Sequence, residues 1–584
     1  MTIIVTHDAY QTIAGIQQLP PSITELCGCK NEKIAFQVYL EGMKGILTAA
    51  REKIFVPELE QPLYRVEISS DCPEVIGEAF IEGYIPDDDN RLVADRVSRE
   101  TYTTFSQYQP GVIFAEYAIP KNFSKNQFTV TVSVYHSLLF SDEELIFTQE
   151  LSVNVLDYTL PDPKDYTMFL DIWQHSSNVA RQFGVPLWSD RHFQLLENVI
   201  ASLADLGQKS IMIVASDCPW CGWGTAIGSK DGSNFYEYSM IDVIKDTEGK
   251  LTCDFRNMQR YIDLCKNYAI DGEIALYGLL GVWNKDGFPR NEVKDYSENI
   301  SVRYFDEADQ TFKYMKTAEE LVAYFSCIVT YFKETNQFEK LKIATDEPEI
   351  KDVESVNAFK VLINEFKAIA PTIKIKMAID REIAISHFID DLDTITLSFP
   401  CITKHIAINK QQTEKHYLWY VCNIPDKPNT LVKNQLVEAR VLGILNSLFD
   451  FDGLTRWAYC AWTAKPREDI RYEIHGFPTG DFSLVYPAKN GEIERSLRVI
   501  QLKKGIIDYE LLTRLKQVTD ESELTPYYNQ IALNQDPQSY MMDKRHTKPN
   551  LYSTNYEDYE QLRQAVIKEL IVHSLREAES EEVK

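Results

Sequence analysis

The first 160 residues alternate apolar and polar positions in the pattern of an antiparallel sheet. In the run FTVTVSVYH (128–136) the phenylalanine and the valines fall on one face and the hydroxyl side chains on the other. A period of two residues, with turn residues between the runs, indicates strands that bury one face and expose the other. We therefore predict an N-terminal antiparallel β-sandwich over residues 1–160, followed by a linker at Leu160–Lys164 (LPDPK).

After residue 160, short apolar runs alternate with amphipathic helical segments such as HFQLLENVIASLADLG (192–207). The runs that we interpret as strands are MFLDIW (168–173), SIMIVAS (210–216), EIALYGLL (273–280), LKIATDE (341–347), IKIKMAID (373–380), DTITLSFP (393–400), HYLWYVC (416–422) and GLTRWAYCAW (453–462). Eight strands that alternate with helices are what a (β/α)8 barrel requires. We predict a multidomain α/β protein with a TIM-like barrel over residues 161–515 and a helical C-terminal extension over residues 516–584.

Composition and charge narrow the class of protein. A chain of 584 residues with 44% hydrophobic residues is too long for one core and too apolar to be disordered. The net charge of −27 argues against nucleic acid or an anionic membrane as the main partner. The N-terminus lacks a basic leader with an apolar stretch, and no run approaches the roughly 20 apolar residues of a membrane span. With 11 scattered cysteines, we expect a cytoplasmic protein with reduced thiols, and we leave homo-oligomerisation open.

Two adjacent acids, Asp346 and Glu347, end the fourth predicted strand and precede Pro348. In a barrel of this kind the active site lies at the carboxyl ends of the strands. Two carboxylates in a partly desolvated cleft are not easily both ionised, so one of them would become a proton donor. Position alone leaves a second interpretation open, in which one acid caps the next helix and the other is solvated.

Several segments resemble glycoside hydrolase family 123, the β-N-acetylgalactosaminidases and their relatives. They are DIWQHSSNVARQFGVPLWSDRHFQLLENVIASLADLGQK (171–209), TDEPE (345–349), GLTRWAYCAW (453–462), GDFSLVYP (480–487) and the pattern S-x-R-x6-G-x2-DYE (496–510). The family implies a β-sandwich followed by a (β/α)8 catalytic barrel, in agreement with the periodicity.

The resemblance also implies an activity, the exo-acting release of terminal β-linked GalNAc from oligosaccharides or glycolipid-derived glycans, with no metal and no cofactor. Family 123 is similar to the family 20 hexosaminidases, and on that similarity Glu347 is the general acid/base while Asp346 orients the 2-acetamido group of the substrate. The acetamide oxygen would be the nucleophile, giving an oxazolinium intermediate and retention. Two alternatives stay open: a relative that acts on another β-hexosaminide such as β-GlcNAc, and a non-catalytic carbohydrate-binding protein.

The apolar face of a sugar ring packs on aromatic side chains, so we expect aromatic residues near the strand ends to bind the substrate. The predicted substrate-binding residues are His175, Trp223, Tyr277, Trp283, Arg381, Trp419, Tyr420 and Trp462. Tyr420 is a candidate donor to the acetamide oxygen by the analogy with family 20. For Arg381, and for Arg456 in the eighth strand, a structural ion pair is an equal alternative.

Two other motifs were weighed. The pair Cys218 and Cys221 (CPWC) has the spacing of a thiol oxidoreductase or of half a zinc site, but Gly222 and Gly224 follow and indicate a loop in place of the helix that activates a redox thiol. We interpret the acidic run 87–89 as a solvated loop of the sandwich, with calcium binding as the alternative.

Overall fold

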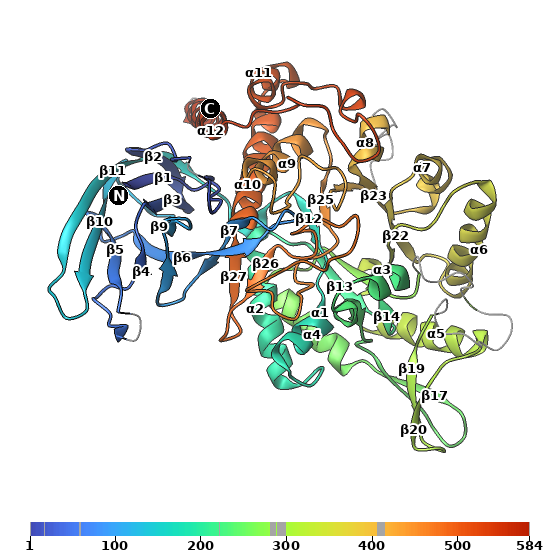
Figure 1. Ribbon diagram of the computed structural model, residues 1–584. Helices are drawn as coiled ribbons and strands as arrows, with labels where there is room; N and C mark the ends of the chain where they lie inside the picture. Colours follow the sequence, from blue (N-terminus) through green and yellow to red (C-terminus); the bar gives the residue numbers. More distant parts are fainter. Residues whose placement is uncertain are drawn as a thin grey trace.

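The chain folds into a β-sandwich and a parallel barrel that lie side by side, with helix α10 (Leu497–Val518) between them (Figure 1). The structure is a computed structural model that describes residues 2–16, 18–57, 60–220, 222–280, 288, 300–405 and 415–582. None of the helices in these ranges is long and apolar enough to span a lipid bilayer.

Two sheets form the sandwich. The six-stranded sheet has the order β2 (Glu25–Lys30), β11 (Glu144–Thr159), β10 (Gln127–Leu138), β5 (Pro62–Ser70), β4 (Gly45–Thr48) and β8 (Thr103–Phe105). The seven-stranded sheet has the order β1 (Thr2–His7), β3 (Glu32–Glu41), β9 (Gly111–Ile119), β6 (Ile76–Pro86), β7 (Leu92–Ser98), β27 (Ile493–Ser496) and β26 (Val485–Pro487). The predicted alternation in β10 is confirmed, because Phe128 and the valines that follow it every second residue are buried between the sheets.

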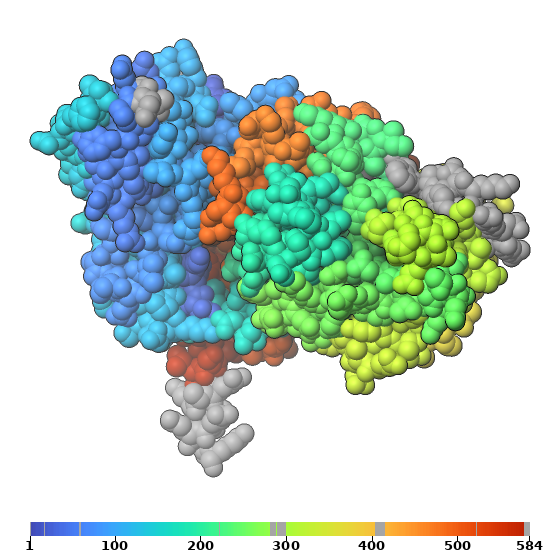
Figure 2. Space-filling view, turned by 90° about the horizontal axis from the view of Figure 1, so that it is seen from below, coloured from blue at the N-terminus to red at the C-terminus, as the bar shows by residue number. Residues whose placement is uncertain are grey.

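The two last strands of the seven-stranded sheet come from a distant part of the chain. β27 pairs with β7, with Arg495 opposite Val97, and β26 pairs with β27. Figure 2 shows this late segment, in orange, between the blue sandwich and the green part of the barrel. Periodicity identifies strands but not their partners, so the sequence did not indicate that residues after the eighth barrel strand would complete the N-terminal sheet.

The barrel contains all eight predicted strands, each parallel to its neighbours. They are β12 (Phe169–Ile172), β13 (Ser210–Val214), β18 (Glu273–Tyr277), β21 (Leu341–Thr345), β22 (Lys374–Ile379), β23 (Thr394–Ser398), β24 (His416–Tyr420) and β25 (Gly453–Arg456). β12 and β13 are joined by a single bridge, in which Lys209 N donates to Leu170 O at 2.9 Å, so the barrel is nearly closed. All carboxyl ends therefore meet at one rim.

Helices surround the strands, in the order expected for βα units. They are α1 (Ser176–Phe183), α2 (Asp190–Leu206), α3 (Gly222–Gly228), α4 (Arg256–Asn267), α5 (Ala318–Glu334), α6 (Val353–Ile369), α7 (Glu382–Phe388), α8 (Phe399–His405) and α9 (Val437–Leu448), followed by α10. The loops near the rim carry a small sheet of β16 (Asp242–Lys245), β17 (Leu251–Asp254), β19 (Arg303–Asp306) and β20 (Thr311–Tyr314), and the strand pair β14 (Cys218–Pro219) and β15 (Tyr236–Glu237).

A buried ion network crosses the barrel interior. Lys376 Nζ lies 2.5 Å from Asp171 Oδ2 and also ion-pairs with Glu273. Lys342 Nζ lies 2.8 Å from Glu273 Oε2, and it donates to Thr394 Oγ1 at 2.6 Å. These side chains come from β12, β18, β21, β22 and β23, so opposite charges link strands on different sides of the barrel.

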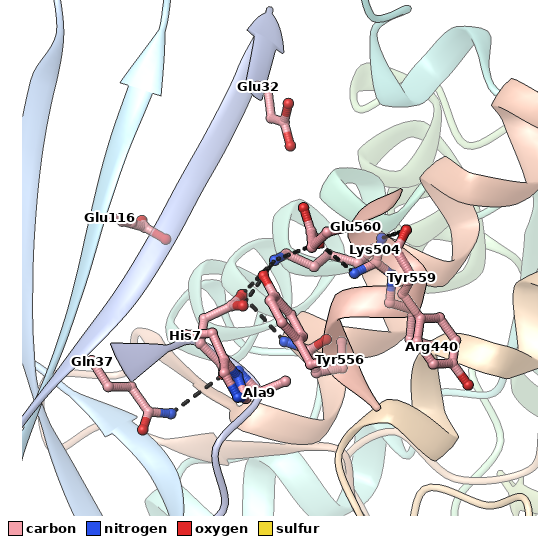
Figure 3. Close-up of polar contacts among 12 residues, drawn as sticks. His7, Ala9, Glu32, Gln37, Glu116, Arg440, Lys504, Tyr556, Tyr559 and Glu560 are labelled. Carbon is pink, nitrogen blue, oxygen red and sulfur yellow. Dashed lines mark hydrogen bonds and ion pairs between the residues drawn. The ribbon is translucent and has the colours of Figure 1, made fainter. Parts of the chain in front are cut away.

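The C-terminal helices α11 (Glu521–Ile531) and α12 (Tyr556–Glu582) pack on α10. Arg440 on α9 is fully buried and pairs with Asp508 on α10 and Glu560 on α12, each at 2.6 Å. Lys504 on α10 lies 2.8 Å from Asp8 in the sandwich, and the ring of Tyr556 stacks on that of His7 at 4.2 Å (Figure 3). Paired charges and a ring stack thus attach α12 to both parts of the molecule.

We expect Arg440→Met to destabilise the fold by about 3–5 kcal/mol, because it leaves the buried Asp508 without its ion-pair partner and removes one cation from the partly buried Glu560. Thermal or denaturant unfolding measures the loss. Arg256→Met is the control, since its ion pair with Asp254 is exposed and its removal should leave the midpoint unchanged. Equal midpoints for the two variants would contradict the role of Arg440.

Candidate active site

The acid pair lies at the carboxyl end of β21, as predicted. All five residues of β21 are buried, whereas Asp346 and Glu347 are half-buried at the rim. Glu347 N donates to Asp346 Oδ1 at 2.9 Å, and Thr345 Oγ1 donates to Asp346 O at 2.9 Å. These local bonds, with Pro348 next in the chain, replace sheet pairing at the strand end. The two carboxyl groups are therefore held at the same opening of the barrel.

Burial gives the two acids different protonation states. Burial, followed by the nearby Asp346 and Asp380, raises the pKa of Glu347 to about 8. Burial also raises the pKa of Asp346 to about 6, although its bond from Glu347 N favours the ionised form. Between these values Glu347 is a proton donor and Asp346 is an acceptor, which is the division of roles that acid–base chemistry needs.

Tyr420, at the end of β24, donates its hydroxyl to Glu347 Oε1. Burial and the neighbouring Glu347 raise the pKa of Tyr420 far above its ordinary value, so the phenol keeps its proton. The sequence placed Tyr420 near the acetamide of the substrate; in this structure it orients the general-acid candidate, and the acetamide contact stays a prediction.

A third carboxylate, Asp380, follows β22 beside the pair and was missed by the sequence analysis. The sequence held a signal for it, because KIATD (342–346) and KMAID (376–380) share a lysine, three apolar or hydroxyl residues and an acid. Arg381 Nε lies 3.3 Å from Asp380 Oδ2, and 42% of the arginine side chain is exposed. The ion-pair alternative for Arg381 is therefore present, and contact with a sugar stays a prediction.

Aromatic rings gather at the carboxyl ends of β12 and β18. Trp220 stacks on Tyr277 with ring centroids 4.2 Å apart, and Tyr277 donates its hydroxyl to Trp220 O at 2.8 Å. Trp173 lies 5.6 Å from Tyr277 and donates from its indole to Asp171 in the ion network. Tyr277 is thus a buried support for Trp220, and this aromatic cluster rests directly on the charged interior of the barrel.

His175 follows β12 and is fully buried, with its ring 4.5 Å from that of Trp220. Burial lowers the pKa of His175 to about 3, so its imidazole is neutral. Neither ring nitrogen has a hydrogen-bond partner among the residues that the structure describes. A neutral imidazole with free polar atoms is suited to a hydroxyl or amide group, and the predicted contact with substrate remains a proposal.

Two predicted substrate-binding residues lie elsewhere. Trp419 is fully buried and donates to Asn446 Oδ1 on α9, because it points to the opposite side of β24 from Tyr420. Trp462 is 1% exposed and donates to Val485 O at 2.8 Å, outside the barrel mouth. Neither indole offers a face to a sugar. The side chain of Trp223 and all of Trp283 lie outside the described part of the chain.

The remaining motifs are structural. Arg456 is buried and pairs with Asp481 at 3.0 Å, so its ion-pair interpretation is the one observed. The acidic run 87–89 is not a free loop, because Asp87 is buried and Asp88 accepts from Thr479 N at 2.8 Å. The loop expected after the cysteine pair is the short helix α3. Burial, followed by Glu237, raises the pKa of the Cys218 thiol well above its ordinary value, which argues against redox chemistry there.

Acids with unlike protonation at the carboxyl rim of a (β/α)8 barrel are the arrangement of a barrel glycoside hydrolase. The chain belongs to glycoside hydrolase family 123, because the family model for the catalytic domain of glycoside hydrolase 123 matches residues 173–515. This range contains the acid pair, Asp380 and Tyr420.

A solved structure from the same family shares the fold. A family 123 glycoside hydrolase from Clostridium perfringens, solved to explain glycolipid glycan hydrolysis, is 16% identical and superposes with a TM-score of 0.71 over 99% of both chains. A β-D-glucuronidase from Dictyoglomus thermophilum gives a TM-score of 0.31 at 10% identity, over 82% of this chain and 98% of that one. A family 2 glycosyl hydrolase from Bacteroides cellulosilyticus gives 0.26 at 11% identity, over 73% and 42%. No curated protein sequence matches the chain.

We predict that Glu347→Gln is more stable than the wild type at neutral and mildly alkaline pH. Folding raises the pKa of Glu347, so the unfolded chain ionises first and wild-type stability falls as the pH rises from about 4.5 to about 8. Glutamine removes that loss, for a gain of about 1–3 kcal/mol at pH 8 and none near pH 4. Melting temperatures of both proteins across this range measure the difference; a gain independent of pH would rule out this cause.

Proposed function

We propose that the protein is an exo-acting β-N-acetylgalactosaminidase that removes terminal β-linked GalNAc from oligosaccharides or glycolipid-derived glycans. The observation that carries the proposal is the pair Asp346 and Glu347, adjacent in the chain and on one rim, where burial raises the pKa of Glu347 further than that of Asp346. Family membership supports it, as does the resemblance to the C. perfringens enzyme, which was solved for its hydrolysis of glycolipid glycans.

The adjacency of the acids favours a substrate-assisted, retaining mechanism. In an ordinary retaining glycosidase the two carboxyl groups flank the scissile bond, and the second attacks the sugar from the opposite face. Asp346 and Glu347 instead come from one strand end and share a local hydrogen bond. A nucleophile carried by the substrate, the 2-acetamido oxygen, removes the need for an opposed carboxylate.

Each residue then has a defined task. Glu347 protonates the leaving glycosidic oxygen, and Asp346 accepts from the acetamide N–H and stabilises the oxazolinium charge as the ring forms. Glu347, now ionised, takes a proton from water, which opens the oxazolinium with net retention. Tyr420 holds Glu347 in place throughout, since its hydroxyl is bonded to that carboxyl group.

Chromogenic β-GalNAc and β-GlcNAc substrates test this proposal. We expect faster turnover of β-GalNAc, a loss in kcat/KM of about 10²–10⁴-fold for Glu347→Gln, and a loss of about 10²–10³-fold for Asp346→Asn. Glu349→Gln is the matched control, because this acid is exposed and bonded to Lys351, and its activity should stay within about twofold.

The outcomes separate the alternatives. Faster turnover of β-GlcNAc would favour the relative that acts on another β-hexosaminide. Hydrolysis of a β-galactoside that lacks the 2-acetamido group would contradict the substrate-assisted route. Glycan binding without any hydrolysis would favour the non-catalytic carbohydrate-binding protein.

The pH dependence of kcat/KM is a second test. Activity needs Asp346 ionised and Glu347 protonated, so the profile should be bell-shaped, falling below about pH 6 and above about pH 8. In Asp346→Asn the acidic limb should disappear, while the alkaline limb should remain but move to lower pH, because the charge of Asp346 raises the pKa of Glu347. An alkaline limb that persists in Glu347→Gln would assign it to another group.

A further inference from the structure

Asp380 occupies the position on β22 that corresponds to Asp346 on β21. Each acid stands four residues after a lysine of the ion network, Lys342 for Asp346 and Lys376 for Asp380. Four residues along a strand return to the same face, so both acids lie about 13 Å above their lysines on the inner side of the barrel. The strands are neighbours, with Thr345 paired to Met377, which brings the two acids to adjacent places on the rim.

The lysines below the rim do not neutralise these acids. Lys376 is paired with both Asp171 and Glu273, and Lys342 is paired with Glu273. The two positive charges therefore already have their partners within the buried ion network. The cation beside Asp380 is Arg381, at 3.3 Å, and its guanidinium is partly in solvent. Among the residues that the structure describes, the opening of the barrel therefore holds three carboxyl groups close to the partly exposed cation of Arg381.

We propose that Asp380 is a positioning residue that acts through Glu347, keeping that carboxyl group in its proton-donating form by the negative charge Asp380 places beside it. This inference rests on the proposed role of Glu347 as general acid. A charge acts through space, so Asp380 needs no bond to the substrate or to Glu347. The repeated KxxxD pattern supplies the charge from the neighbouring strand.

Physical reasons support a charge effect over a purely structural one. The side chain of Asp380 is 31% exposed and pairs with the adjacent Arg381, which is the N-cap residue of α7 but makes no side-chain bond to the helix. Ionised Asp380 disfavours a second negative charge on Glu347, whereas Arg381 favours it, and the effect of Asp380 on the pKa of Glu347 exceeds that of Arg381. Burial raises the pKa of Asp380 as well, and Arg381 opposes that rise.

The groups that face Glu347 come from several strand ends. They are Asp346, Asp380, Arg381, Tyr420, Cys401 and Cys422. Burial raises the pKa of both thiols, which remain neutral, and Tyr420 keeps its proton. Within the described part of the chain, Asp346, Asp380 and Arg381 are thus the charged groups that shift the pKa of Glu347.

The test is the alkaline limb of kcat/KM for β-GalNAc hydrolysis. Asp380→Asn should move this limb to lower pH by about 0.5–1 unit, the effect of losing one nearby charge in a partly hydrated site. Asp380→Glu should restore it, and Arg381→Met should move it to higher pH. Glu382→Gln removes an exposed acid two residues away and should leave the limb in place.

A limb at the wild-type position in Asp380→Asn, or an equal loss of activity at every pH, would overturn the proposal. A stability measurement separates this failure from that of the proposed function. The rise in melting temperature caused by Glu347→Gln at pH 7.5 should be smaller in the Asp380→Asn background, and an unchanged rise would count against Asp380. If the wild type hydrolyses no β-hexosaminide, the proposed function fails while this comparison still decides whether Asp380 acts on Glu347.

Discussion

Ion pairs between two lysines and two carboxylates inside the barrel determine how its strands are aligned relative to one another along the barrel axis. A buried charge is costly without a partner, and Lys342 and Lys376 find theirs in Asp171 and Glu273 on other strands. If any of these strands shifted by one residue, its charged side chain would point out of the barrel and the partner charge would be left buried without a counterion. The residues four positions further on, at the rim, are the acids on β21 and β22, His175 on β12 and Tyr277 on β18. The ion network therefore also determines which groups meet at the opening.

Local patterns allowed much of this structure to be predicted. An apolar run between helical segments is a local signal, and all eight barrel strands were found in this way. Strand partners are not local, so the pairing of β27 with β7 was not foreseen. At the site, position identified Asp346 and Glu347, but Trp419 was placed beside Tyr420 although neighbours on a strand point to opposite sides. Burial and charge around Glu347 depend on the ends of β21, β22, β23 and β24 coming together, which no single segment of the sequence reveals.

The site and the fold make opposing demands on the same atoms. The burial that keeps a proton on Glu347 also makes that carboxyl group unfavourable in the folded state once the pH exceeds the ordinary range of a glutamate. The carboxyl groups at the rim bear this cost, whereas the charges inside the barrel and at the α9–α10–α12 junction are paired. The unfavourable charges at the opening are thus supported by ion pairs below them, inside the barrel, and beside them, at the helix junction.

The shared seven-stranded sheet has a consequence for how the protein is made. During synthesis the first five strands of that sheet leave the ribosome long before β26 and β27, which lie after the whole set of barrel strands. Until then the edge of β7 has no β27 to cover it, and an open edge is a template for pairing with other chains. The seven-stranded sheet can be completed only after most of the barrel has been synthesised. The folding of the sandwich and the folding of the barrel are therefore coupled, although most of each lies in a separate part of the chain.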